Sequence, residues 1–206
     1  MSLKKSLPDP LEKLLQGYIE DFVLQNQAAR IIAEGLGIIG IGFWPVIDHL
    51  TFRTLNIEVR AKEFLKHQYA YDTKLGVLEY DNWFAKVYRK TGYPAIFIDQ
   101  AFPGEQGKKS LIPDWVRTFG DQTLHHVAVR VEDIEKSIFY LEKQSVKFAG
   151  QIVGESGTDL RQIFTQAEMK KGKAFSVIEL TERHRGFDGF SPPQANRLME
   201  STRWNA

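Results

Sequence analysis

Hydrophobic residues recur at helical spacing near the start of the chain. Asp9 suits the N-cap of a helix, and Pro10 suits its first position. One apolar stripe follows, made of Leu11, Leu14, Leu15, Tyr18, Ile19, Phe22 and Val23. A second helical stretch over residues 27–34 is expected to end at Gly35. Both helices are expected to pack on a sheet by their apolar faces.

From Ile47 onward the pattern changes to short strands separated by turns. A strand over residues 49–54 precedes a helix that Asn56 caps. Three further strands are expected over residues 74–80, 83–89 and 95–100. Residues 103–120, rich in proline and glycine, then predict a linker.

The same order of elements begins again after this linker. His126 lies in a strand, Asp133 caps a helix, and strands follow over residues 147–153, 160–165 and 174–182. A shift of 126 − 49 = 77 residues superposes His49 on His126 and Arg53 on Arg130, and it keeps the cap and the helix phase aligned. We interpret this as an internal duplication.

The predicted fold class is therefore α+β. Two tandem βαβββ modules are expected to form a curved mixed sheet around a metal site, with N-terminal helices and a C-terminal helix. The expected segments of this one compact domain are an N-terminal helical segment (1–45), a first module (46–102), a linker (103–122), a second module (123–183) and a C-terminal turn and helix (184–206). The C-terminal helix either gates a pocket or only packs on the sheet edge.

Composition narrows the function classes. The 206 residues include 27 basic and 26 acidic ones, for a net charge of +1, which argues against nucleic-acid binding by bulk electrostatics. Without cysteine, disulfides and thiolate zinc sites are excluded, so any metal must use His, Asp or Glu. No apolar run reaches the ~18 residues of a membrane span, and no signal peptide is evident. We expect a cytoplasmic protein with no membrane partner.

Candidate chemistry begins with His49, Thr51 and Arg53, which share one face of a strand. An imidazole and a guanidinium are costly on a core-facing surface, although a lone histidine is more often a hydrogen-bonded core residue. The repeat changes this reading, because His126 occupies the matching position in the second half. His125 is expected to face away, since a slip of one residue turns a side chain to the other face.

A third candidate ligand comes from the final strand. Glu179 stands between Ile178 and Leu180, and buried carboxylates are rarely left unpaired. Two histidines and one carboxylate form a facial triad that leaves about three positions open on an octahedral ferrous ion. At the shift of 77, Glu179 corresponds to Phe102 (179 − 77 = 102) in the first half. Three protein ligands are therefore favoured over four.

These residues resemble the vicinal oxygen chelate superfamily. His49-Leu50-Thr51-Phe52-Arg53-Thr54 is similar to the signature of its 2-oxoadipate dioxygenase/decarboxylase branch, in which an essential arginine follows the histidine by four residues. The last third resembles the 4-hydroxyphenylpyruvate dioxygenase family, in the runs Leu160-Arg161-Gln162-Ile163-Phe164-Thr165, Glu179-Leu180-Thr181-Glu182-Arg183, Gly186-Phe187 and Gly189-Phe190.

The resemblance implies a non-haem Fe(II) enzyme that uses dioxygen to decarboxylate and hydroxylate a 2-oxo acid. It implies His49, His126 and Glu179 as metal ligands, Arg53 as the catalytic anchor for the substrate carboxylate, and Gln162 as a pocket residue. Arg183 is a further substrate-binding candidate, with an ion pair inside the fold as its alternative role. Zinc, nickel, cobalt or manganese in place of iron stays open, and so does a homodimer.

Two other readings remain. The first is a glyoxalase-like metal-dependent isomerase or lyase, which a fourth ligand and indifference to oxygen would identify. The second is a non-catalytic small-molecule-binding protein with the same fold. It would show no gain in oxygen consumption over a panel of 2-oxo acids.

Overall fold

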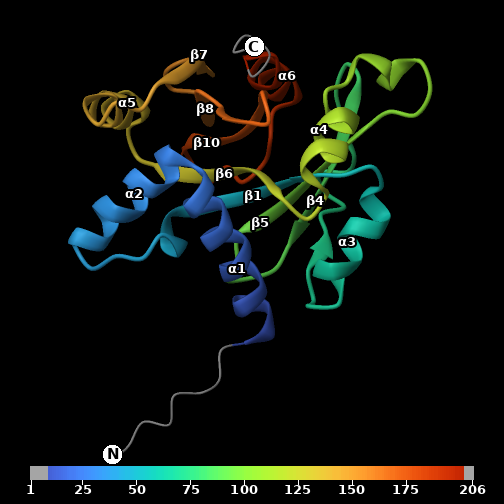
Figure 1. Ribbon diagram of the computed structural model, residues 1–206, viewed down its shortest axis with the longest axis horizontal. Helices are drawn as coiled ribbons and strands as arrows, with labels where there is room; N and C mark the ends of the chain where they lie inside the picture. Colours follow the sequence, from blue (N-terminus) through green and yellow to red (C-terminus); the bar gives the residue numbers. More distant parts are fainter. Residues whose placement is uncertain (1–8, 202–206) are drawn as a thin grey trace, which may run out of the picture.

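The computed structural model describes residues 9–201, which build one curved mixed sheet with helices on both sides (Figure 1). Residues 1–8 of the predicted N-terminal segment and residues 202–206 of the predicted C-terminal segment lie outside this range. The strands are β1 (Ile47–Arg53), β2 (Ala70–Tyr71), β3 (Leu78–Glu79), β4 (Trp83–Arg89), β5 (Ala95–Ala101), β6 (Leu124–Val131), β7 (Phe148–Val153), β8 (Leu160–Thr165), β9 (Glu168–Lys170) and β10 (Lys173–Arg183). The helices are α1 (Pro10–Gln25), α2 (Gln27–Ile38), α3 (Ile57–Leu65), α4 (Ile112–Phe119), α5 (Ile134–Lys143) and α6 (Pro192–Ser201).

The sheet repeats one topology in its two halves. Its strand order is β2-β4-β5-β1-β6-β10-β8-β7, with β3 paired to β4 and β9 paired to β10. In each half the first strand runs parallel to the last, β1 with β5 and β6 with β10. The halves meet where β1 and β6 pair antiparallel. The predicted α+β fold with two βαβββ modules is confirmed, while the segment boundaries stay a prediction.

The two faces of β1 serve different purposes. Leu50 and Phe52 are fully buried in a core that also contains Leu11 and Leu15 of α1. The predicted N-cap of α1 is confirmed, since Asp9 Oδ1 accepts a hydrogen bond from the Leu11 amide at 2.9 Å. His49 and Arg53 of β1 face the other side of the sheet, where Arg53 contacts Met199 of α6. Helices α4 and α6 lie on this side (Figure 1). Helix packing on one face therefore leaves the other face for a site.

Helix α2 ends later than its sequence pattern predicts. It passes through Gly35 and stops at Ile38. Gly40, with φ +75°, follows in the left-handed region that glycine tolerates. The Ile41 amide donates to the Leu36 carbonyl at 2.9 Å, as in a Schellman motif. The predicted stop at Gly35 was wrong because a helix ends where the backbone turns left-handed, not at its first glycine.

Two other expectations needed correction. The predicted strand over residues 74–80 is largely a turn, because Asp72 Oδ1 accepts hydrogen bonds from the amides of Lys74 and Leu75, and only β3 forms at its end. The predicted linker contains α4, whose first turn accommodates Pro113. Gly120, with φ +90°, ends that helix.

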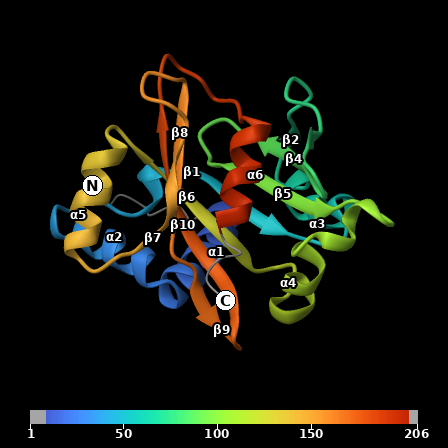
Figure 2. The same ribbon diagram turned by 90° about the horizontal axis from the view of Figure 1, so that it is seen from above.

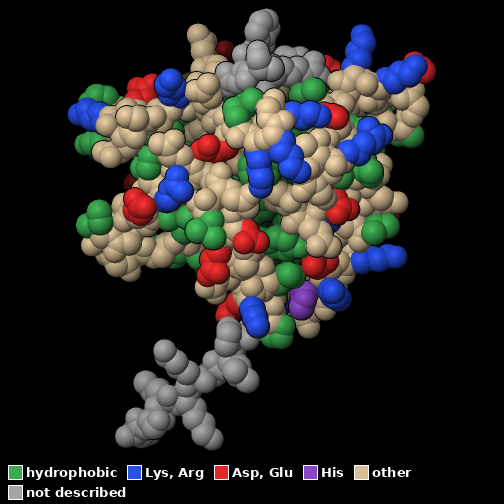
Figure 3. Space-filling view, viewed as in Figure 1, with side chains coloured by type: hydrophobic (Ala, Val, Ile, Leu, Met, Phe, Trp, Pro, Cys, Tyr) green, Lys and Arg blue, Asp and Glu red, His purple; other side chains and the backbone are tan. Residues whose placement is uncertain are grey.

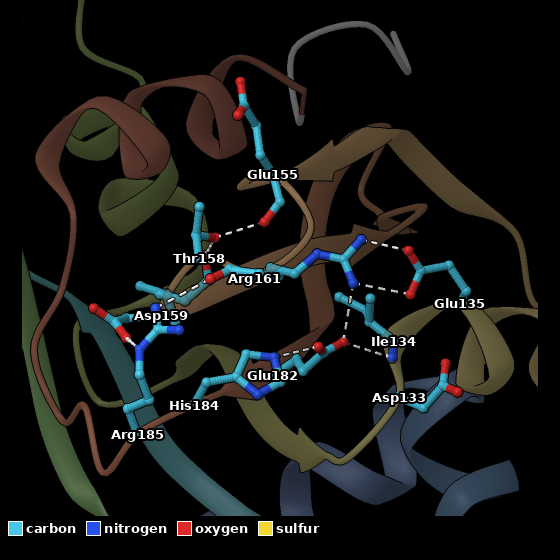
Figure 4. Close-up of polar contacts among 12 residues, drawn as sticks. Asp133, Ile134, Glu135, Glu155, Thr158, Asp159, Arg161, Glu182, His184 and Arg185 are labelled. Carbon is cyan, nitrogen blue, oxygen red and sulfur yellow. Dashed lines mark hydrogen bonds and ion pairs between the residues drawn. The ribbon is translucent and has the colours of Figure 1, made fainter.

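A cluster of ion pairs and hydrogen bonds around the buried Glu182 links the start of α5 to the sheet (Figure 4). Glu182 Oε2 accepts a hydrogen bond from the Ile134 amide at 2.8 Å, at the start of α5. The same oxygen is 3.3 Å from Arg161 Nη1, and Glu182 Oε1 is 2.5 Å from His184 Nε2. Glu182 is buried on the opposite face of β10 from Glu179. This cluster is structural and lies outside the candidate site.

Helix α6 closes the concave face of the sheet, as the view from above shows (Figure 2). Its Leu198 is buried against Ala149 of β7, Phe164 of β8 and Val177 of β10. In the described part of the chain, no helix combines the length and apolar character that crossing a membrane requires. The face drawn in Figure 3 carries both basic and acidic side chains, in keeping with the near-balanced composition.

Candidate metal centre

The three predicted ligands come together on the concave face. His49 lies on β1, His126 on β6 and Glu179 on β10, and all three are buried. Their candidate ligand atoms all lie within 4.8 Å of one another. Glu179 Oε2 is 3.6 Å from His49 Nε2 and 3.3 Å from His126 Nε2. Adjacent strands thus turn three ligand atoms toward one point.

These spacings fit a divalent metal ion. Metal–ligand bonds of about 2.1 Å separate neighbouring ligand atoms by about 3.0–3.4 Å, depending on whether the geometry is octahedral or tetrahedral. Two imidazoles and one carboxylate are the donor set of non-haem ferrous sites. The hydroxyl of Thr51 is 2.7 Å from His126 Nε2, so a bound ion would displace that hydrogen bond.

Glu179 is oriented through one of its two oxygens. Gln162 Nε2 and Thr181 Oγ1 each donate a hydrogen bond to Oε1 at 2.5 Å. This leaves Oε2 facing the histidines, the arrangement needed for a carboxylate that binds through one oxygen. Gln162, predicted as a pocket residue, does line the cavity, but its amide nitrogen is engaged with the carboxylate.

His49 is held by a carboxylate that sequence reasoning missed. Asp48 Oδ1 lies 2.9 Å from His49 Nδ1. Arg183 donates hydrogen bonds to both oxygens of Asp48, at 2.8 and 2.9 Å. Arg130 Nη2 lies 3.2 Å from Asp48 Oδ2. Arg183, predicted as a substrate-binding candidate, therefore stands behind His49 in a separate groove that Asp48 and Arg130 also line. The sequence signal that could have identified Asp48 is its position, as an acidic residue directly before a candidate ligand histidine.

His126 has an equivalent partner in His125. The prediction that His125 faces away was wrong: it is buried, and its Nδ1 lies 3.0 Å from His126 Nδ1. The pairing of β1 with β6 explains this. Thr51 pairs with His126 and Phe52 with Leu124, so His125 is an extra residue in β6. Such a bulge bends the strand and redirects its side chains.

Buried charges shift the pKa values of the candidate ligands. Burial opposes the charged form of His49, but the carboxylates of Glu179 and Asp48 outweigh it and raise its pKa to about 9. Burial lowers the pKa of His126 to about 4. Burial alone would raise the pKa of Glu179, yet His49 and His126 bring it well below its usual range. In the metal-free protein at neutral pH, His49 therefore carries the proton that a metal ion would replace.

Arg53, the predicted anchor, is buried on the same face of β1 as His49. The two residues are four positions apart, or about 13 Å along a strand. Arg53 Nη2 is 2.9 Å from Met199 Sδ, and Arg53 Nε is 3.7 Å from Asp99 Oδ2. Arg53 Nε and Asp99 Oδ1 are both buried without a hydrogen-bond partner. Burial lowers the pKa of Arg53 to about 10 and raises that of Asp99 to about 7.

A phenylalanine occupies the place where a fourth ligand would stand. In the second half Glu179 pairs with Ala128, and in the first half Phe97 pairs with Thr51, the residue that matches Ala128 at the shift of 77. Phe97 is therefore the counterpart of Glu179, at an offset of 179 − 97 = 82, and it lines the cavity. The predicted counterpart, Phe102, was wrong because the loops before the last strands differ by 82 − 77 = 5 residues.

Comparisons with known proteins give fold neighbours only. No family profile matches the sequence, and no curated protein matches it. Among solved structures, a candidate hydrolase from Shewanella frigidimarina NCIMB 400 is similar with a TM-score of 0.72 at 17% identity, over 91% of this chain and 100% of that one. Hydroxyglutarate synthase from Oryza sativa, solved with 2-oxoadipate, is similar with a TM-score of 0.68 at 16% identity, over 98% of each chain.

A candidate glyoxalase superfamily protein from Ralstonia eutropha JMP134 is similar with a TM-score of 0.63 at 12% identity, over 92% of each chain. At these identities the comparisons establish the fold. The chain has the fold of the glyoxalase, or vicinal oxygen chelate, superfamily.

Proposed function

We propose that this protein is a non-haem Fe(II)-dependent dioxygenase that acts on a 2-oxo acid by oxidative decarboxylation and hydroxylation. The observation that carries the proposal is Phe97 at the position of the first half that corresponds to Glu179 in the second half. An isomerase of this fold would be expected to close its metal with a fourth protein ligand. Among residues 9–201, only His49, His126 and Glu179 form such a ligand group.

Each part of the site has a role in this chemistry. His49, His126 and Glu179 would hold Fe(II), which when bound supplies redox chemistry and Lewis acidity. Arg53 would bind the substrate carboxylate remote from the metal, because a guanidinium can hold it with two parallel hydrogen bonds. Phe97 and Phe190, both in the cavity wall, would keep water out.

The fold neighbours suggest the first substrate to test. The rice enzyme is named a hydroxyglutarate synthase and binds 2-oxoadipate. A carboxylate at each end of such an acid would match a metal centre at one end of the site and Arg53 at the other. We therefore place 2-oxoadipate ahead of other 2-oxo acids.

Anaerobic reconstitution with Fe(II), followed by oxygen-electrode measurements, tests the proposal. We expect oxygen consumption to rise on addition of 2-oxoadipate and CO₂ to be released in equal amount. 4-Hydroxyphenylpyruvate and 2-oxohexanoate serve as comparison substrates, and Glu179→Ala serves as the metal-site control. Oxygen consumption that no 2-oxo acid stimulates would contradict the dioxygenase. Metal-dependent isomerisation without oxygen would instead favour the glyoxalase-like alternative.

A further inference from the structure

The cavity at the metal centre is too small for an organic acid. It measures about 40 Å³ beneath Phe190, Leu198 and Met199. Ligand pockets usually measure about 300–1,000 Å³. A substrate with one end at the metal must therefore place the rest of its chain in an adjoining space.

A larger groove adjoins the cavity on the side of α4. It has a volume of about 470 Å³ and lies between α4 and the hairpin of β9 and β10. We call it the α4 groove. The residues on which its chemistry depends are Arg53, Lys109, Trp115, His125, Lys173 and Phe175.

Two buried residues join the groove to the cavity. His125 lines both spaces. Arg53 lines the groove, while its guanidinium contacts Met199 and faces Asp99, and both of these line the cavity. The unpartnered Arg53 Nε and Asp99 Oδ1 stand at this boundary. Unsatisfied buried polar atoms are uncommon in folded proteins and call for an explanation, such as an absent water, an absent ion or a functional role.

The walls of the groove suit an anion with an apolar body. The rings of Trp115 and Phe175 are nearly parallel, 9° apart, and Trp115 Nε1 donates to the Phe175 carbonyl at 2.8 Å. Lys109 and Lys173 are exposed, and Asp114, 2.5 Å from Lys173 Nζ, also lines the groove. Lys and Arg side chains gather in this region of Figure 3, where Figure 1 draws α4.

We propose that the α4 groove is the outer half of the substrate site and the entrance to the metal cavity. It would receive an anionic organic acid between the aromatic wall and the lysines, and pass it between Arg53 and His125 toward the metal. The inference rests on the proposed function for the identity of that acid. This route through the α4 groove differs from a route beneath α6, which would require that helix to move.

The test measures how fast an anionic chelator reaches a bound metal, and so needs no catalysis. Protein loaded with Co(II) is mixed with dipicolinate, and the loss of the protein–Co(II) spectrum is followed. Leu111→Trp adds bulk at a half-exposed groove residue, and Leu65→Trp adds the same bulk at a half-exposed residue of α3. We expect removal to be at least about tenfold slower in Leu111→Trp, and unchanged in Leu65→Trp.

A tether across α6 tests the competing route. An ideal Cβ at Gly150 would lie 3.4 Å from Ser201 Cβ, near the separation of about 3.5–4.5 Å found in disulfides. Because the chain has no cysteine, Gly150→Cys with Ser201→Cys can form a single disulfide that fixes the end of α6. Oxidised and reduced forms of this variant share any backbone strain at Gly150. We expect them to lose Co(II) at the same rate.

The outcomes separate the inference from the function on which it rests. The proposed entrance would be wrong if Co(II) were removed at equal rates from Leu111→Trp and Leu65→Trp. It would also be wrong if only the oxidised disulfide slowed the removal. Failure to bind Co(II) at all would overturn the metal centre and the inference with it. Slower removal in Leu111→Trp combined with no oxygen consumption would support the entrance and reject the dioxygenase.

Discussion

The Nδ1 atoms of His125 and His126 lie 3.0 Å apart, although the two residues are consecutive in one strand. The same relation exists in the other half, where Asp48 contacts Nδ1 of His49 at 2.9 Å. Each preceding residue is an extra residue in the pairing of β1 with β6. The duplication has thus placed a bulge and a hydrogen-bond partner beside each candidate ligand.

His125 should fix the tautomer of His126. If Nε2 of His126 binds the metal, Nδ1 must carry the proton, and Nδ1 of His125 would accept it. His125→Phe keeps a ring but removes the acceptor, and we expect the Co(II) affinity to fall about 10–100-fold. His125→Asn, whose amide oxygen can accept, should retain most of the affinity. Isothermal titration with Co(II) measures this, with His67→Phe as the control. Equal losses in the Phe and Asn variants would exclude the role.

Asp48 should support His49 and the fold together. Its side chain and that of Arg183 are only 6% and 5% exposed, so Asp48→Ala leaves a buried guanidinium without its main partner. We expect the free energy of unfolding to fall by about 3–5 kcal/mol, as measured by urea denaturation of the metal-free protein. Asp159→Ala breaks the exposed pair with Arg185 and should cost at most about 1 kcal/mol. Similar losses in both variants would argue against a buried ion pair.

Phe97 should determine how many protein ligands the metal has. Phe97→Glu places a carboxylate at the first-half position that corresponds to Glu179, where the sheet already directs a side chain into the cavity. Without metal this buried charge should lower the melting temperature, and Zn²⁺ should restore it. Oxygen consumption with Fe(II) should be lost, because one open coordination position is taken. Phe97→Leu is the matched control. A Phe97→Glu variant that keeps full oxygen consumption would refute this assignment.

Metal affinity should rise with pH up to about pH 9. In the metal-free protein the pKa of His49 is raised to about 9, so the imidazole is protonated at neutral pH and must lose that proton to bind a metal. The apparent Co(II) affinity should therefore increase about tenfold per pH unit between pH 7 and 9, and then level off. Titrations in buffers of different ionisation enthalpy should show release of about one proton. A flat profile over this range would count against a protonated His49.

Arg53 should act on the substrate and leave the metal unaffected. Lysine cannot reproduce a bidentate contact with a carboxylate, so Arg53→Lys should weaken 2-oxoadipate binding by about 10–100-fold, or about 1.4–2.7 kcal/mol. Its Co(II) affinity should equal that of the wild type. Calorimetric titration of the Co(II)-loaded proteins with 2-oxoadipate gives both quantities. Normal substrate binding by Arg53→Lys would remove the anchor role.

Local periodicity was enough to find the strands that carry His49, His126 and Glu179. Alternation along a strand assigns each side chain to a face, and the repeat after 77 residues matched the two histidines. The caps at Asp9 and Asn56 could also be predicted, because an N-cap needs only its own next few residues. For these features the sequence by itself was informative, since the interactions involved are short-range.

Pairing between distant segments decided the rest. The counterpart of Glu179 is Phe97 because of the register in which β5 pairs with β1. A loop that is shorter or longer by a few residues changes this register, and the sequence of the strand itself does not reveal the change. The bulges at Asp48 and His125 arise from one extra residue in a two-strand pairing, and such an insertion turns a side chain from one face to the other. The α4 groove exists only because a segment predicted as a linker folds as a helix beside β10. The sequence by itself therefore named the candidate ligands, while the groups that contact them and the groove beside them became visible only in the tertiary structure.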